Sequence, residues 1–202
     1  MSTLQNRLQH YELILASGSP RRKMLLEEME LVFRIDTRPV AEVLPQGKSP
    51  EEVAVYLSKL KADAFEADYF DKRTLIITAD TVVALENKIL GKPSGKEDAA
   101  KMLRQLSGRE HRVITGVTLR TSQKEKSFFV STEVYFKQLM PEEIAFYVDN
   151  YKPFDKAGAY GIQEWIGHAG IEKINGSYFN VVGLPTHRLY EELLLFITDN
   201  KV

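Results

Sequence analysis

The chain has 202 residues, of which 27 are basic and 28 are acidic, so its formal net charge is -1. This balance gives no general attraction for polyanions and argues against stable nucleic-acid binding, so any phosphate chemistry requires a local cluster of positive charge. The sequence contains no cysteine, which excludes disulfides, thiolate zinc sites and cysteine nucleophiles and fits a reducing compartment.

Strands and helices alternate in the first half of the chain. The pairs Ser19–Pro20 and Ser49–Pro50 predict helices that begin with a capping serine and a proline in the first turn. Short runs of apolar residues predict the strands between them. The expected elements are a strand at 11–16, a helix at 20–29, a strand at 31–35, a loop at 38–47, a helix from 50 to about 67, a strand at 74–78 that ends at 79–81, and short strands at 82–85 and 89–90.

The second half of the chain places two long strands next to each other. Residues 111–121 and 127–138 flank a polar turn and predict an antiparallel pair. The other expected elements are a helix at 97–106, a helix at 141–150, a mostly irregular segment at 151–176 with a strand near 171–174, and a final amphipathic helix after Pro185. Alternation followed by adjacent strands predicts an α/β fold with a mixed sheet.

The terminal sequence and the apolar runs also bear on location. The first residues lack the apolar core of a signal peptide, and no stretch approaches the ~18 apolar residues of a membrane span. We therefore expect a cytoplasmic protein that does not bind membranes. Its length suits one domain over residues 1–202, built as two lobes that share a core.

A glycine-containing loop at residues 17–22 is the first candidate site. A strand that leads through such a loop into a helix offers free backbone N–H groups and the positive end of the helix dipole to an anion. The hydroxyls of Ser17 and Ser19 add donors for phosphate oxygens. Arg21 and Arg22 add charge, although two cations in a first turn oppose the helix dipole unless a polyanion binds there. The same pattern also fits an ordinary capped helix with solvated arginines.

Asp80 is the second candidate because it interrupts the apolar run of residues 75–85. A lone carboxylate in an apolar setting costs several kcal/mol unless it is paired or ligated. Carboxylates at the carboxyl ends of α/β strands line the ligand crevice, where they bind hard divalent cations or accept a proton from water. The alternative is an aspartate that satisfies a turn at a strand break, with help from Thr81.

Other charged residues carry weaker signals. A flanking glycine and proline fix the backbone around Lys92, and Lys61 lies between apolar residues on the long predicted helix. Glu42 and the pair Asp155–Lys156 complete this group. Each of them is individually typical of a solvated surface charge.

Gln163 follows a run of small residues and a tyrosine at 157–162, a pattern that suits the close approach of a planar ligand. A carboxamide both donates and accepts hydrogen bonds, so it matches the N3–H and a carbonyl of uracil or thymine. A loop that simply crosses over the core is the alternative.

In their order along the chain, these motifs resemble those of the Maf family of nucleoside triphosphate pyrophosphatases. The resemblance covers nearly the whole chain after about residue 12. It is carried by residues 15–22 (LASGSPRR), 79–83 (ADTVV), 91–93 (GKP), 115–117 (TGV), 155–163 (DKAGAYGIQ) and 174–185 (INGSYFNVVGLP). It implies a mixed twisted sheet with flanking helices and two lobes around a deep cleft, similar to inosine-triphosphate pyrophosphatases, in a cytoplasmic and often dimeric enzyme.

The same resemblance implies hydrolysis of a nucleoside triphosphate to the monophosphate and pyrophosphate with a divalent cation, Mg²⁺ or Mn²⁺. Asp80 matches the proton acceptor of the family. Glu42, Lys61 and Lys92 match its charged positions. We expect the two lysines to contact the triphosphate, and Glu42 and Asp80 to hold the metal.

Three positions that separate substrate classes in the family, Arg21, Thr81 and Gln163, resemble those of the branch that acts on dTTP and UTP. Glu164–Trp165 departs from the family pattern, where small residues are commoner, and this departure could alter base selection. Two alternatives remain open: a pyrophosphatase for modified or purine nucleotides such as 7-methyl-GTP, and a nucleotide-binding regulator of cell division without catalysis.

Overall fold

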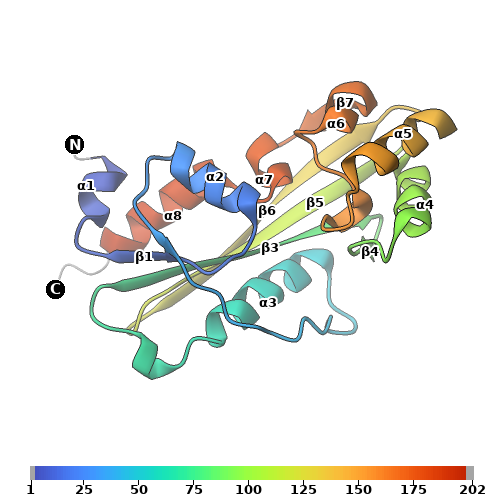
Figure 1. Cartoon of the computed structure of the whole chain (residues 1–202). Helices are drawn as coiled ribbons and strands as arrows, with labels where there is room; N and C mark the ends of the chain where they lie inside the picture. Colours follow the sequence, from blue (N-terminus) through green and yellow to red (C-terminus); the bar gives the residue numbers. More distant parts are fainter. Residues whose placement is uncertain (1–2, 199–202) are drawn as a thin grey trace.

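Seven strands share one mixed sheet in the computed structural model, which describes residues 3–198 (Figure 1). The strand order is β2-β1-β3-β5-β6-β7, with β4 paired to β3. Strand β1 runs parallel to β2 and β3, and the remaining pairs are antiparallel. The strands are β1 Glu12–Leu15, β2 Arg34–Ile35, β3 Thr74–Leu85, β4 Lys88–Leu90, β5 Glu110–Arg120, β6 Glu125–Phe136 and β7 Ile171–Asn175. The predicted α/β class and the antiparallel pair β5–β6 are confirmed.

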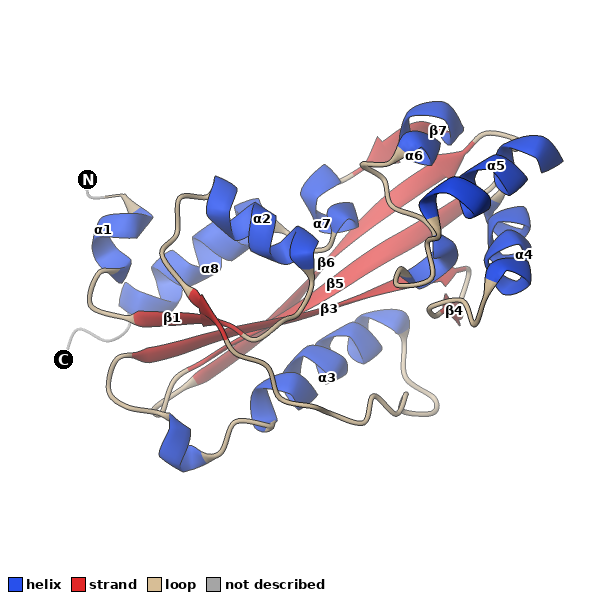
Figure 2. Cartoon of the chain, viewed as in Figure 1, coloured by secondary structure: helices blue, strands red, loops and turns tan. Residues whose placement is uncertain are grey.

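The helices cover both faces of this sheet (Figure 2). Helix α3 packs against β3 and β5 on one face, while α2, α7 and α8 lie on the other. Helices α4, α5 and α6 gather at the far end, near β4. The helices are α1 Leu4–Leu8, α2 Pro20–Glu28, α3 Pro50–Asp63, α4 Lys96–Leu106, α5 Pro141–Tyr151, α6 Trp165–Gly170, α7 Tyr178–Val182 and α8 Thr186–Thr198, with short 3₁₀ turns η1 Ala67–Tyr69 and η2 Ala157–Ala159. Within the described residues, no helix combines the length and the apolar character that a membrane crossing requires.

Several predicted boundaries differ from the structure. Helix α3 ends at Asp63 and η1 forms separately, so the single helix predicted to residue 67 is wrong. The irregular segment predicted at 151–176 contains η2 and α6 as well as β7. Ser19 occupies the N-cap of α2, but its side chain makes no capping hydrogen bond. By contrast, Ser49 and Glu52 form a complete capping box at the start of α3.

The strand break predicted at Asp80 is also wrong, because β3 runs through it without interruption from Thr74 to Leu85. Successive residues of a strand face opposite sides of the sheet. Asp80 therefore lies on the α3 face and Thr81 on the face of α2 and α7. Both still reach a common space, because β1 pairs with β3 only as far as Ile77 and β4 begins to pair at Val83. The stretch between them is an open edge of β3.

Gly116 allows α3 to lie directly on the sheet beside Asp80. It pairs with Asp80 across β3 and β5. A Cβ at this position would lie 2.2 Å from the backbone oxygen of Ala54 in α3. Buried hydroxyls complete the contact. Thr78 Oγ1 donates to the backbone oxygen of Ser58 at 2.6 Å, and the hydroxyl oxygen of Ser58 lies 2.9 Å from Thr118 Oγ1. The helix is thus fixed against the strand that carries Asp80.

We predict that Gly116→Ala lowers the free energy of unfolding by about 1–3 kcal/mol, because the added methyl group forces α3 away from the sheet. Urea unfolding followed by circular dichroism measures this change. Gly91→Ala is the matched control, since a Cβ there meets open space. Equal stability of the two variants would contradict the close approach.

His111 makes the fold sensitive to acid. Its ring is buried, stacks on Phe136 and places Nε2 2.7 Å from the hydroxyl of Tyr160. Burial lowers the pKa of His111 to about 3, below its ordinary value of 6.5. Between these two pH values His111 is protonated in the unfolded chain but not in the folded chain. The free energy of unfolding therefore decreases as the pH falls below 6.5.

We predict that this residue alone removes up to roughly 1.4 kcal/mol of unfolding free energy per pH unit within that window. Urea unfolding at pH 7.5 and at pH 4.5, in the natural protein and in His111→Gln, tests this. The loss between the two pH values should be smaller in the variant. The same loss in both proteins would rule out a proton-linked contribution from His111.

Candidate active site

A cleft of about 720 Å³ lies along the open edge of β3. Its size is typical of small-molecule sites. Its walls come from the loop that enters α2, the irregular segment after β2, the end of α3, and the segment around η2. Every site residue predicted from the sequence lines it: Ser17, Ser19, Arg21, Arg22, Glu42, Lys61, Asp80, Thr81, Lys92 and Gln163.

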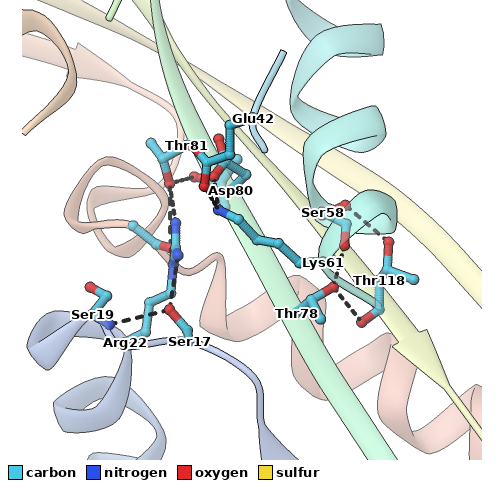
Figure 3. A network of polar contacts seen from close by, with 12 residues as sticks. Ser17, Ser19, Arg22, Glu42, Ser58, Lys61, Thr78, Asp80, Thr81 and Thr118 are labelled. Carbon is cyan, nitrogen blue, oxygen red and sulfur yellow. Dashed lines mark hydrogen bonds and ion pairs between the residues drawn. The ribbon is translucent and has the colours of Figure 1, made fainter. Parts of the chain in front are cut away.

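Two carboxylates share one ammonium group in this cleft (Figure 3). Lys61, in the last turn of α3, places Nζ 2.9 Å from Oε1 of Glu42 and also donates to Oδ1 of Asp80. Burial raises the pKa of Glu42, but the hydrogen bond and charge of Lys61, with Lys92 and Arg22 nearby, leave that pKa below its ordinary value. Glu42 is therefore ionised at neutral pH.

Arg22 ties three parts of the site together. Its Nε donates to the Gly183 oxygen at 2.9 Å, Nη1 to Ser17 Oγ at 3.1 Å and Nη2 to Thr81 Oγ1 at 3.1 Å. Burial lowers its pKa, partly opposed by the charge of Asp80, yet an arginine side chain stays protonated in proteins. Figure 3 shows the guanidinium between Ser17 and Thr81. Arg22 thus anchors the loop to β3 and to the end of α7.

Arg21 points to the opposite wall. Its Nη1 lies 3.0 Å from Oδ2 of Asp155, and Oδ1 of the same carboxylate lies 2.8 Å from Nζ of Lys156. Burial raises the pKa of Asp155, but the hydrogen bonds from Lys156 and Arg21 bring it below the ordinary value. One carboxylate therefore holds a cation from each wall of the cleft.

Gln163 carries an unsatisfied buried atom. Among the described residues, its Oε1 has no hydrogen-bond partner, although the atom is shielded from solvent. Such an atom loses its water without compensation, so a turn of the amide that brings this oxygen to a hydrogen-bond donor would be favourable. Thr81 differs in this respect: its hydroxyl lies 2.9 Å from Thr115 Oγ1 and accepts from Arg22.

Sequence reasoning missed several residues that support the site. Thr115 holds Thr81, and the Gly183 oxygen holds Arg22. Tyr147 is fully buried and contacts Glu164 behind the cleft wall. Tyr147 lies on the apolar face of α5, so its pattern indicated only core packing. Thr115 and Gly183 do fall within the motifs quoted above, which was the available signal.

The carboxylates suit a hard cation. No group of three or more histidine, aspartate or glutamate side chains gathers as a metal site in the part of the chain that the structure describes. Glu42 and Asp80 nevertheless meet at one point, on Lys61. Mg²⁺ is usually bound through one or two carboxylates together with substrate phosphates and water, so this pair fits the requirement.

Comparison with known proteins identifies the family of the chain. Residues 12–196 match the family model described as Maf-like protein. The chain belongs to this family. Proteins named dTTP/UTP pyrophosphatase are similar over almost the whole chain: that of Cytophaga hutchinsonii is 52% identical over 93% of this chain and 85% of its own, and that of Christiangramia forsetii is 50% identical over 94% and 96%. That of Porphyromonas gingivalis is 47% identical over 96% of this chain and 98% of its own.

For this Maf-like protein we predict that Arg22→Lys lowers the free energy of unfolding by about 2–4 kcal/mol, because one ammonium cannot reach the three acceptors that the guanidinium joins. Chemical unfolding measures the loss. Arg21→Lys is the matched control: it can still pair with Asp155 at the edge of the cleft and should cost less than about 1 kcal/mol. Equal losses in the two variants would contradict the anchoring role of Arg22.

Proposed function

We propose that this protein hydrolyses dTTP and UTP to the nucleoside monophosphate and pyrophosphate, the activity named for its relatives. One observation carries the proposal. The carboxylates of Glu42 and Asp80 both pair with Lys61, in the same cleft as the loop at residues 17–22. A site that only binds a polyphosphate needs cations and backbone donors. Two carboxylates beside them add the means to activate water.

The triphosphate is bound by positive groups on both sides of the cleft. The loop before α2 offers serine hydroxyls and the N-terminal end of the helix to phosphate oxygens. Arg21 and Lys92 line the same space and provide positive charge for the phosphate oxygens. Arg22 keeps the loop in place through Ser17 and Thr81, so its own charge acts on the phosphates from a fixed position.

Asp80 accepts a proton from the attacking water. The water oxygen forms a bond to the α phosphorus, and the bond from that phosphorus to the oxygen bridging to the β phosphorus breaks. The leaving group is pyrophosphate, and the proton of the water passes to the Asp80 carboxylate. Lys61 and Lys92 stabilise the negative charge that develops on pyrophosphate, which is usually the largest catalytic contribution.

Mg²⁺ or Mn²⁺ is the cofactor that we assign to Glu42 and Asp80. When bound, the cation supplies Lewis acidity that neutralises charge on the phosphates. The Lys61 ammonium pairs with both carboxylates in the protein alone, so it offsets part of their charge and holds them close together. Glu42 comes from the irregular segment after β2, and Lys61 is its ion-pair partner.

Gln163 recognises the base. When the amide turns toward the cleft that Gln163 lines, its oxygen can accept the N3–H of uracil or thymine and its N–H can donate to a neighbouring carbonyl. Thr81 contributes to base selection indirectly, because its hydroxyl holds Arg22 and Thr115.

We also propose that the protein works in the cytoplasm as one domain over residues 1–202 and pairs with a second copy as a homodimer, without nucleic-acid or membrane partners.

We predict pyrophosphate release from UTP and dTTP when Mg²⁺ or Mn²⁺ is added, and a loss of roughly 10²–10⁴-fold in turnover for Asp80→Asn. A coupled pyrophosphate assay with UTP, dTTP, CTP, GTP and 7-methyl-GTP measures both effects. Circular dichroism checks that the variant is folded, since asparagine keeps the volume of the side chain.

Asp68→Asn serves as the control, because Asp68 is an exposed carboxylate outside the cleft. It should match the natural protein. Faster turnover of GTP or 7-methyl-GTP would replace the pyrimidine assignment with the purine one. Binding of triphosphates without any pyrophosphate release would instead favour the regulatory alternative, and near-normal turnover by Asp80→Asn would remove Asp80 from the mechanism.

A further inference from the structure

A chain of ion pairs and hydrogen bonds, most of them partly buried, lies behind the wall of the cleft that carries Gln163. Lys156 places Nζ 2.8 Å from Oδ1 of Asp155 and 3.1 Å from Oε1 of Glu164. The hydroxyl of Tyr147 donates to Oε2 of Glu164 and accepts from the backbone N–H of Gly161 at 3.0 Å. Both oxygens of Glu164 are therefore used to fix Lys156 and Tyr147.

The turn at Gly161 packs tightly on these side chains. A Cβ at Gly161 would lie 3.0 Å from Cδ of Glu164 and 3.2 Å from Cε of Lys156. The backbone N–H of Glu164 donates to the Gly161 oxygen at 3.0 Å, which closes the turn that contains Gln163. Lys156 and Gln163 thus belong to one wall of the cleft, and Glu164 contacts that wall from behind.

Lys156 still has donor capacity for a ligand. Its side chain is only 10% exposed, and the residue lines the cleft. An ammonium group has three N–H donors and no acceptor. Within the described residues, its ion pairs are with Asp155 and Glu164, so one N–H remains for a group in the cleft.

Gln163 alone does not distinguish uracil or thymine from cytosine, whereas Lys156 can. No hydrogen bond to a described residue fixes the orientation of the Gln163 amide, and its Oε1 is unsatisfied. A carboxamide that can turn over presents either a donor or an acceptor to the same base edge. It therefore pairs with cytosine as well as with uracil. An ammonium group only donates, so it can hydrogen-bond to the C4 carbonyl oxygen of uracil or thymine but not to the amino group that cytosine carries there.

We propose that Lys156 is the specificity-determining residue that favours uracil and thymine over cytosine, and that Glu164 is its positioning residue. The inference rests on the proposed function, since it assigns the base selectivity of that cleft. Glu164 acts from behind the wall, because this side chain does not line the cleft. Glu164 is also one of the two positions at which the sequence departs from the family pattern of small residues.

The test compares kcat/KM for UTP and CTP in the natural protein and in Lys156→Gln. Glutamine can donate or accept, so we expect the UTP-to-CTP ratio to fall at least roughly tenfold, the effect of losing one charged hydrogen bond. Lys156→Arg keeps a cation without an acceptor and should retain the preference for UTP. Lys152→Gln, an exposed lysine of the same segment, is the matched control and should leave the ratio unchanged.

The positioning role of Glu164 is tested by Glu164→Gln, which keeps the shape of the side chain and removes its charge. We expect the KM for UTP to rise severalfold while kcat changes little, and the UTP-to-CTP ratio to fall less than in Lys156→Gln. Glu142→Gln, an exposed carboxylate on the helix that carries Tyr147, should behave like the natural protein. An unchanged ratio and KM in Glu164→Gln would remove the positioning role.

Calorimetric binding of the non-hydrolysable α,β-methylene analogues of UTP and CTP separates this inference from the proposed function. If the natural protein binds the UTP analogue more tightly and Lys156→Gln does not, the inference stands even without turnover. Equal losses for UTP and CTP in Lys156→Gln would place Lys156 on the shared triphosphate and overturn it. A natural protein that treats UTP and CTP alike would overturn it as well, whereas hydrolysis itself would remain established.

Discussion

Asp80 and Lys61 form the ion pair on which the arrangement of the cleft depends. A carboxylate within an apolar strand is costly unless a partner compensates it, and Lys61 provides that compensation from the last turn of α3. The position of Lys61 in turn requires α3 to lie against the sheet, which Gly116 permits and the hydroxyls of Ser58 and Thr78 maintain. Stability of the fold and placement of the Asp80 carboxylate therefore share the same contacts.

The alternation of side chains along β3 divides the work of the site between two faces. Asp80 faces α3 and pairs with Lys61, while Thr81 faces α2 and accepts a hydrogen bond from Arg22, which holds the loop at residues 17–22. Asp155 then joins the two walls of the cleft, because it pairs with Arg21 on one side and with Lys156 on the other. Ion pairs therefore link the elements that form the walls of the cleft.

Much of this could be predicted from the sequence because local signals coincide with structure. The serine–proline pairs located the starts of α2 and α3, and the motifs quoted from the family contain many of the residues that line the cleft, although not Glu42 and Lys61. The continuity of β3 through Asp80 could not be predicted, since it depends on a lysine that precedes Asp80 by 19 residues. The buried contact of Tyr147 with Glu164 was also hidden, because an apolar helical pattern does not reveal which tyrosine hydroxyl is used.

The open edge of β3 has a consequence for inhibition. Between Ile77 and Val83 no described strand pairs with β3 on the side of β1 and β4, so main-chain groups on that side border the cleft. A molecule designed to bind there as an added strand segment would draw its affinity from the peptide backbone. Side-chain substitutions cannot remove such contacts, so resistance to that inhibitor would have to arise through changes in the shape of the surrounding loops.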